Sequence, residues 1–275
     1  MNYKKKIRFT NEYNEIAKYL RDMKINTVCE SANCPNRMEC FSKHKLTFLI
    51  MGNICTRNCK FCNVKKGKFG EDILENEIAN IKEVIKKLCL KYVVITSVTR
   101  DDIEDGGVGY YCKVIKELRQ EFPEVHLEVL IPDFKKDMKK ASEVAFASAN
   151  VISHNIETIK RLYKYYRKNA NFEFSLNLLK NLKELNPKII TKSGFMVGLG
   201  ETDNEVFELL KILYSNKVDA VVIGQYFQPS KFNAKVERFV DDKTFKTYEN
   251  FAYNLGFKYV LSERFARSSS LEIYD

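Results

Sequence analysis

The sequence predicts an α/β protein that folds as an open, partial (β/α)6 barrel of the TIM type, with an extension at each end. From Leu46 onward, strand-like segments alternate with segments whose apolar residues recur at helical spacing, which favours βαβ units and a parallel sheet. The strand segments are continuous apolar runs such as 92–98 (YVVITSV), typical of strands buried on both faces. Six such units are too many for a small flavodoxin-like sheet and too few for an eight-unit barrel. A doubly wound open sheet is the alternative.

Each expected element has a local signal. The first strand, 46–51, is a short apolar run that stops at Gly52-Asn53, and the first barrel helix, 77–90, has apolar residues three and four apart. Helix 174–185 closes at Asn186-Pro187, and helix 245–255 stops at Gly256. The other expected strands are 92–98, 127–131, 151–156, 189–199, 220–227 and 259–261, and the other helices are 110–122, 138–147 and 205–214. We expect three regions: an N-terminal extension (1–45), the barrel (46–260) and a C-terminal segment (261–275).

The composition is that of a globular protein, with 45% hydrophobic and 30% charged residues. No run of 18 uncharged apolar residues exists, and no apolar stretch follows the basic N-terminus, so neither a membrane span nor a signal peptide is expected. We therefore expect a cytoplasmic protein in which clustered cysteines bind metal rather than form disulfides.

The net charge of +10 favours acidic partners. The alternative is that lysine pairs such as Lys86-Lys87 and Lys139-Lys140 only solvate helix surfaces. The sequence has no compact basic and aromatic block of the kind used by single-strand nucleic-acid binders. We therefore expect neither nucleic acid nor membrane as a partner.

Six of the eight cysteines form two triplets. The first is Cys29, Cys34 and Cys40 (C-x4-C-x5-C), and the second is Cys55, Cys59 and Cys62 (C-x3-C-x2-C). Three thiolates leave one corner of a four-iron cluster open for a substrate, cofactor or weak ligand. The alternative for the second triplet is a zinc site, for which His44 is the nearest fourth ligand in the sequence.

The second triplet follows a buried strand and has an aromatic residue, Phe61, before its last cysteine; it resembles the signature of the radical S-adenosylmethionine (SAM) superfamily. The resemblance implies that Cys55, Cys59 and Cys62 hold a [4Fe–4S] cluster whose open iron chelates the amino and carboxylate groups of SAM. The reduced cluster would then cleave SAM to methionine and a 5′-deoxyadenosyl radical. It also implies further cofactor contacts by Phe61, Thr96, Ser97, Asn155, Arg167, Gly198 and Glu201.

The two triplets in this order resemble the lipoyl synthase family, and the similarity extends over nearly the whole chain. It includes segments 96–102 (TSVTRDD), 128–134 (EVLIPDF), 154–158 (HNIET), 192–202 (KSGFMVGLGET) and 224–230 (GQYFQPS). The C-terminal 267–270 (RSSS) stands where the family has Arg-Ser-Ser-Tyr, so Ser270 replaces a tyrosine. Residues 166–168 (YRK) stand where the family commonly has Val-Arg-Pro, which puts the geometry of that loop in doubt.

The family resemblance implies a second [4Fe–4S] cluster on Cys29, Cys34 and Cys40, completed by the oxygen of Ser269, with Ser268 as the nearest competitor. An oxygen ligand suits a sulfur-rich cluster poorly, which fits a cluster that is dismantled to donate sulfur. The implied reaction inserts sulfur at C6 and C8 of a protein-bound octanoyl-lysine. The implied partners are an octanoylated lipoyl-carrier domain, an electron donor such as a flavodoxin or ferredoxin, and a cluster-repair protein.

Two other functions remain open at this point. One is a different radical SAM enzyme with two clusters, such as a tRNA methylthiotransferase, although this would be expected to carry an additional RNA-binding domain. The other is a non-catalytic metal-binding module for nucleic acid. Of the remaining candidates, Cys89 and Cys112 are expected to be structural, His154 is as easily structural as functional, and Asp101, Asp102 and Asp105 are expected to hold their loop.

Overall fold

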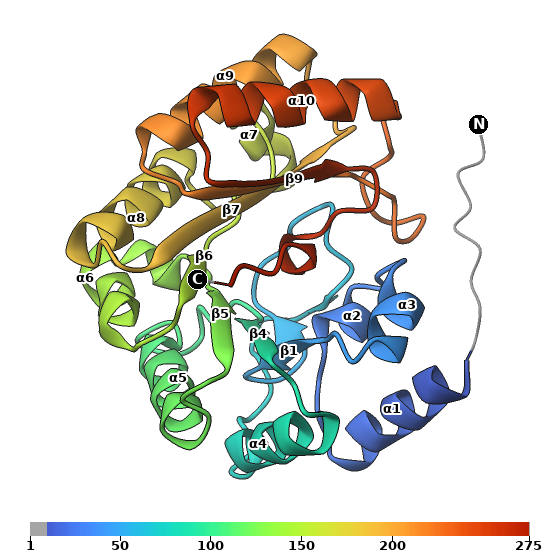
Figure 1. The fold of residues 1–275 in the computed structure, drawn as a ribbon, viewed down its shortest axis with the longest axis vertical. Coiled ribbons are helices and arrows are strands. Elements are labelled where there is room, and N and C mark those ends of the chain that lie inside the picture. Colours follow the sequence, from blue (N-terminus) through green and yellow to red (C-terminus); the bar gives the residue numbers. More distant parts are fainter. Residues whose placement is uncertain (1–9, 275) are drawn as a thin grey trace.

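A computed structural model describes residues 10–274 of the chain. Seven parallel strands form one sheet in the order β1-β4-β5-β6-β7-β8-β9, which is also their order along the chain (Figure 1). A doubly wound sheet would reverse its strand order, so that alternative is wrong and the open partial barrel is confirmed. The strands are β1 (Thr47–Ile50), β4 (Tyr92–Ser97), β5 (His126–Leu130), β6 (Val151–Ser153), β7 (Ile190–Val197), β8 (Ala220–Gln225) and β9 (Tyr259–Glu263).

Helical segments connect successive strands and cover the outside of the sheet (Figure 1). They are α4 (Glu77–Leu88), α5 (Val108–Glu121), α6 (Met138–Ala141) with η2 (Ser142–Phe146), η3 (Lys160–Leu162) with α7 (Tyr163–Tyr166) and α8 (Phe172–Leu185), α9 (Asp203–Ser215) and α10 (Asp242–Leu255). The crossovers from β1 to β9 number six, as the strand and helix alternation predicts. The apolar stripes of these helices pack on the apolar strands, which places the core between the two layers.

Two expected elements are shorter than the sequence suggests. The helix expected at 138–147 is one α-helical turn followed by a 3₁₀ segment, because the Ser142 hydroxyl donates to the Met138 carbonyl at 2.7 Å and competes with the helical ladder. The strand expected at 151–156 ends at Ser153. Beyond it the chain turns into the barrel mouth, and Glu157 takes a positive φ of 65°.

The elements outside the barrel are additional to those expected from the sequence. They are α1 (Asn11–Asp22), α2 (Val28–Ser31), α3 (Arg37–Ser42), the small parallel pair β2 (Ile54–Cys55) and β3 (Lys65–Lys66), and the 3₁₀ turns η1 (Phe134–Lys136) and η4 (Ser268–Ser270). Helix α1 begins at the N-cap Thr10 and buries one face on α3, where Tyr13 stacks on Phe41 with ring centroids 5.8 Å apart. The expected extension 1–45 begins outside the described residues, which exclude its first nine positions.

The two extensions meet beside β1, where the sheet is open between its end strands (Figure 1). Thr27 forms a β-bridge with Phe48 of β1, and the Asn36 side-chain amide donates to the Phe265 carbonyl at 2.7 Å. Lys45 pairs with Glu272 at 3.0 Å. Segments far apart in the sequence therefore close this side of the barrel together.

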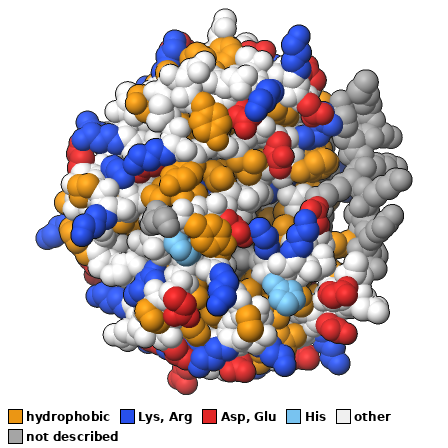
Figure 2. Space-filling model, viewed as in Figure 1, with side chains coloured by type: hydrophobic (Ala, Val, Ile, Leu, Met, Phe, Trp, Pro, Cys, Tyr) orange, Lys and Arg blue, Asp and Glu red, His pale blue; other side chains and the backbone are white. Residues whose placement is uncertain are grey.

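Ile273 buries its side chain against the first residues of β6, β7 and β8, so the C-terminal segment is anchored at the amino ends of these strands. On the face shown in Figure 2, cationic and anionic side chains are interspersed around a central group of hydrophobic ones. Within residues 10–274, no helix combines the length and the apolar character that crossing a membrane requires.

Candidate active site

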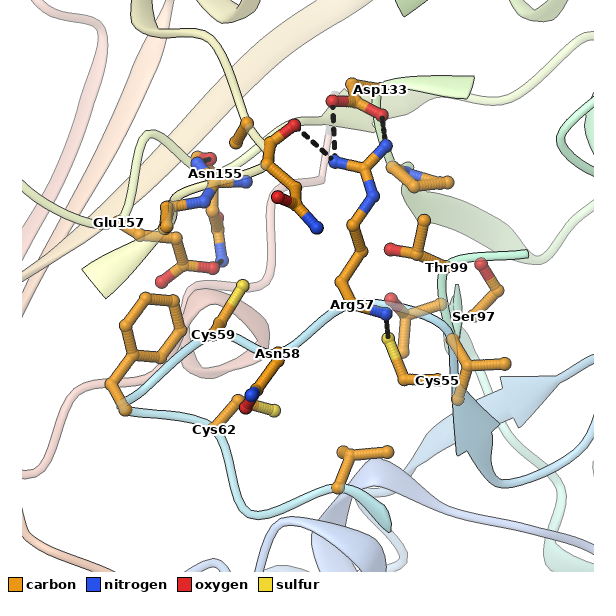
Figure 3. A pocket seen from close by; sticks show the side chains of 18 of the residues that line it. Cys55, Arg57, Asn58, Cys59, Cys62, Ser97, Thr99, Asp133, Asn155 and Glu157 are labelled. Carbon is orange, nitrogen blue, oxygen red and sulfur yellow. Dashed lines mark hydrogen bonds and ion pairs between the residues drawn. The ribbon is translucent and has the colours of Figure 1, made fainter. Parts of the chain in front are cut away.

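The second cysteine triplet lies in the loop that follows β1, at the carboxyl ends of the barrel strands (Figure 3). Cys55, Cys59 and Cys62 line a cavity of about 480 Å³. Five of the other predicted cofactor residues line the same cavity: Phe61, Thr96, Ser97, Asn155 and Arg167. The parallel sheet explains this convergence, because the loops after β1, β4 and β6 all emerge at one edge.

Arg57 fixes the shape of the cysteine loop. Its guanidinium is ion-paired with Asp101 after β4 and with Asp133 after β5, the latter at 2.9 Å (Figure 3). The backbone N–H of Arg57 lies 3.4 Å from Cys55 Sγ, to which it donates. The loop is thus held from two neighbouring strands, and the expectation that Asp101 helps to hold its loop is supported by this ion pair.

The cysteines of this triplet are half-buried, and their thiols are close enough to influence one another. Burial raises the pKa of Cys62 to about 12, and the neighbouring Cys59 and Cys55 raise it further. Burial also raises the pKa of Cys59. Burial thus favours the protonated thiols of Cys59 and Cys62, and a bound metal must displace these protons.

The zinc alternative depends on His44 as a fourth ligand beside the second triplet. Among residues 10–274, no three or more Cys, His, Asp or Glu side chains gather around a site for a single metal ion. A zinc ion holds sulfurs at about 2.3 Å from one centre, whereas the thiolates of a [4Fe–4S] cluster bind separate corners of a larger body. His44 contacts the Leu88 carbonyl at 3.3 Å and does not line this cavity, which counts against the zinc alternative.

Polar groups in the cavity wall remain available for a ligand. Within the described part of the chain, Ser97 Oγ and Arg167 Nε are buried and have no hydrogen-bond partner. Arg167 is held in place through Nη1, which donates to the Asn155 carbonyl at 3.0 Å and to the Tyr163 hydroxyl at 2.9 Å. An unpaired guanidinium N–H suits an anionic group such as the carboxylate of an amino acid.

Two predicted cofactor residues do not line this cavity. Glu201 accepts from the backbone N–H groups of Gly198 at 2.6 Å and Leu199 at 2.9 Å, and it pairs with Arg238 at 3.4 Å. Gly198 has a φ of 101°, and an added Cβ would lie 2.6 Å from the Arg238 carbonyl oxygen. The geometry therefore gives both residues a role in shaping the turn after β7.

The first triplet lies in the gap that the two extensions close. Cys29, Cys34 and Cys40 line a cavity of about 230 Å³. Burial raises the pKa of Cys29 to about 12, with Cys34 and Cys40 adding to the shift. The Arg267 side chain from the C-terminal segment hydrogen-bonds to Cys34, which connects this segment directly to the triplet.

The three C-terminal serines have different surroundings. Ser268 Oγ donates to Asn155 Oδ1 at 2.8 Å, and Ser270 Oγ accepts from the Arg267 N–H at 3.0 Å. Ser269 lines the cavity of the first triplet, and its hydroxyl has no hydrogen bond to another described residue. Of the three described serines, Ser269 is thus the one that lines the cavity of the first triplet without a side-chain hydrogen bond.

A third cavity, of about 570 Å³, joins the two cysteine sites. Cys29 and Cys34 of the first triplet and Cys62 of the second all line it. Apolar side chains form much of the wall between them: Val28, Phe61, Val94, Leu130, Phe195, Met196, Val222, Tyr226, Phe227 and Phe265. The arrangement can receive an unbranched apolar chain and present it to both cysteine sites.

Sequence reasoning missed several groups at this junction. Glu157 lines both the cavity of the second triplet and the joining cavity; burial raises its pKa, and Arg167 opposes that shift.

Inside the barrel, Lys192 and Glu128 form an ion pair at 2.6 Å with both side chains fully buried. His154 is buried between the Ile131 carbonyl at 2.8 Å and Ser175 Oγ at 2.9 Å, so its contacts are structural.

The matching family model is that of the radical SAM superfamily, and it covers residues 49–213, which include the second triplet. The [FeFe]-hydrogenase maturase HydG from Carboxydothermus hydrogenoformans has a similar fold, with a TM-score of 0.61 and 15% identity over 92% of this chain and 66% of that one. The chain is therefore a member of the radical SAM superfamily.

Lipoyl synthases resemble the chain far more closely in sequence. The one from Caldicellulosiruptor saccharolyticus is 48% identical over 97% of this chain and 93% of its own length. The one from Caldanaerobacter subterraneus subsp. tengcongensis is 48% identical over 96% of this chain and 93% of its own length. Within the superfamily, the chain belongs to the lipoyl synthase family.

Proposed function

We propose that this protein makes lipoyl groups by inserting one sulfur atom at C6 and one at C8 of a protein-bound octanoyl-lysine. The observation that carries the proposal is one largely apolar cavity that is lined by cysteines of both triplets and shares lining residues with the cavity of each. A radical SAM enzyme with a single cluster has no use for the second site, whereas sulfur insertion needs both a radical source and a sulfur source. Family membership supports the same conclusion.

Cys55, Cys59 and Cys62 would hold the [4Fe–4S] cluster that binds SAM, with Ser97, Asn155 and Arg167 toward the amino-acid end of SAM. When bound, this cluster supplies the electron that cleaves SAM and so generates a radical able to abstract hydrogen from an unactivated carbon. Cys29, Cys34, Cys40 and Ser269 would hold the second cluster, which serves as the sulfur-donating substrate.

The protein's own contribution is positioning and the exclusion of water. Arg57, held by Asp101 and Asp133, fixes the cysteine loop relative to the strand ends. The apolar wall of the joining cavity would align the acyl chain so that C6 and C8 pass between the two sites. Phe61 and Cys62 line both the joining cavity and the SAM cavity, so the acyl chain and SAM would meet at this point.

The reaction also requires partners. The acyl chain would arrive on a lipoyl-carrier domain, electrons would come from a donor such as a flavodoxin or ferredoxin, and the spent cluster would be rebuilt by a repair protein. The cytoplasm provides the reducing conditions in which such thiolate clusters persist. We propose no role for nucleic acid, because the joining cavity is lined by side chains suited to an alkyl chain rather than to bases.

The direct test is anaerobic incubation of the reconstituted protein with SAM, a reductant and an octanoyl-lysine peptide, followed by mass measurement of the peptide. The expected change is a gain of two sulfur atoms and a loss of two hydrogens. A methylthio adduct, or an unchanged peptide in the presence of SAM cleavage products, would contradict the proposal.

Anaerobically reconstituted protein is expected to contain about eight irons per chain, because each triplet would hold one [4Fe–4S] cluster. Iron and zinc analysis of the same sample measures this directly. About four irons, or stoichiometric zinc, would mean that one triplet holds no such cluster.

Replacing Ser269 by Ala is expected to change the electron paramagnetic resonance and Mössbauer spectra of the cluster on the first triplet, because an oxygen ligand is lost from one iron. The matched control is Ser268→Ala, which removes a hydrogen bond to Asn155 and is expected to leave those spectra unchanged. The reverse result would make Ser268 the ligand.

A further inference from the structure

Lysines gather on three loops at the barrel mouth, around the cavity of the second triplet. We call this set the basic rim; its members are Lys60, Lys65, Lys66, Lys68, Lys164, Lys168, Lys231 and Lys235, and all are exposed. Lys60, Lys66 and Lys168 line the cavity itself. The loops follow different strands, so the grouping is a product of the fold and is not visible as a block in the sequence.

Hydrogen bonds join the three loops at one point. The Lys60 N–H donates to the Tyr166 carbonyl at 3.0 Å, and the Lys60 carbonyl accepts from the Ala234 N–H at 2.9 Å. The Asn233 side-chain amide donates to the Cys62 carbonyl at 2.9 Å. The basic rim is therefore a continuous surface that surrounds the cysteine loop.

The eight lysines of the basic rim have no carboxylate partner among the described residues, whereas Lys160 and Arg161 beside them pair with Glu173 and Glu205. Segments 56–70, 160–170 and 226–236 contain no Asp or Glu. Exposed lysines elsewhere form such pairs as well, as Lys86 does with Glu121 and Lys217 with Glu184. On the face shown in Figure 2, by contrast, both signs of charge are mixed.

Each loop also exposes an aromatic ring beside one of its lysines. Phe232 is 85% exposed, Phe69 is 64% exposed and Tyr165 is 55% exposed. The ammonium groups of Lys231, Lys68 and Lys164 lie 5.2, 5.3 and 5.0 Å from the respective ring centroids. Exposed aromatic side chains among charges are the usual composition of a protein-binding surface.

We propose that the basic rim docks an acidic protein domain, with the exposed aromatics as anchors, so that an acylated lysine of that domain enters the cavity beneath. This inference rests on the proposed function, and it identifies the surface that would recognise the carrier domain with the octanoylated lysine. Point charges on flexible lysines suit long-range steering of an acidic partner. The arginines of these segments that lie nearest the cavity, Arg57 and Arg167, are committed to contacts inside it.

The test compares two triple variants of equal net charge. In the rim variant, Lys164, Lys231 and Lys235 are replaced by Glu; none of them lines a cavity of the active site. In the control variant, the exposed Lys87, Lys113 and Lys180 on the barrel helices are replaced by Glu. Both are assayed on an octanoylated acidic carrier domain and on an uncharged short peptide that carries octanoyl-lysine.

The rim variant is expected to lose about 10- to 100-fold in kcat/KM on the carrier domain and to lose the salt dependence of that reaction. Its activity on the peptide should match the wild type, and the control variant should match the wild type on both substrates. Equal losses in the two variants would overturn the docking inference. Failure of the wild type on both substrates would instead overturn the proposed function.

Phe232→Ala provides a second measurement that leaves the charge unchanged. It is expected to raise KM for the carrier domain several-fold and to leave the peptide reaction unchanged. Phe146→Ala is the control, because the Phe146 side chain is 64% exposed on another surface. If the rim variant instead loses affinity for a short single-stranded RNA and keeps its affinity for the carrier domain, the surface binds nucleic acid and the inference is wrong.

Discussion

Replacing Cys29, Cys34 or Cys40 by Ala is expected to abolish sulfur insertion and to leave reductive cleavage of SAM intact. These cysteines line the cavity in the opening of the barrel, whereas SAM would bind in the cavity of the second triplet. The measurement is parallel quantification of 5′-deoxyadenosine and of the peptide mass. Replacing Cys55, Cys59 or Cys62 should instead abolish both products, because the site that generates the radical is lost.

Cys112→Ala is the matched control for both sets. Cys112 is a half-buried thiol on α5, packed against apolar residues and away from all three cavities of the site. Its replacement should change neither product. Lipoyl product from a Cys29, Cys34 or Cys40 variant would show that the first triplet is not the source of sulfur.

Lys192→Met is expected to destabilise the protein by about 3–5 kcal/mol, because it leaves the Glu128 carboxylate buried without its cation. Glu128 also accepts from the Tyr92 hydroxyl at 2.7 Å and from Ser153 Oγ at 2.8 Å, and in the variant these two hydrogen bonds remain but no cation balances the carboxylate. The Lys192 ammonium additionally donates to the Leu271 carbonyl at 2.8 Å, two residues beyond Ser269. Urea unfolding measures the stability, and iron content reports whether the first site still assembles.

Two variants make this result interpretable. Lys211→Met breaks an exposed pair with Glu208 and should change the stability by no more than about 0.5 kcal/mol. The double variant Lys192→Met with Glu128→Gln removes both charges and should recover part of the loss. A Lys192→Met protein as stable as the Lys211→Met protein would show that the buried pair contributes nothing to the barrel.

The sequence predicted the barrel well because its signals are local. Continuous apolar runs such as 92–98 become buried parallel strands, and the cysteine loop follows the first of them. The interior ion pair was missed because lysine and glutamate in a strand-like segment ordinarily indicate exposure, whereas here Lys192 and Glu128 compensate each other across the barrel.

The site was predicted only in part, because the sequence shows local signals but not contacts between distant segments. Ser97 and Asn155 lie at or just after the ends of their strands, and both line the cavity of the second triplet. Glu201 does not line it, because its carboxylate accepts hydrogen bonds from backbone N–H groups of its own turn. The basic rim could not be found as a block, because its lysines come from the separate segments 56–70, 160–170 and 226–236, which only the tertiary structure brings together. Likewise, spacing alone did not separate Ser268 from Ser269; the hydrogen bond to Asn155 distinguishes them.

The contact between Asn36 and Phe265 has a consequence for how the protein matures. These residues are 229 positions apart, so during synthesis the cysteines at 29, 34 and 40 leave the ribosome long before the segment that carries Ser269. The loop with Cys55, Cys59 and Cys62 is also joined to later segments, because the Lys60 N–H donates to the Tyr166 carbonyl and the Asn233 side-chain amide donates to the Cys62 carbonyl. The first triplet therefore acquires its complete surroundings only after the segment with Ser269 has been made and folded, and a cluster there would have all of its proposed ligands only from that moment.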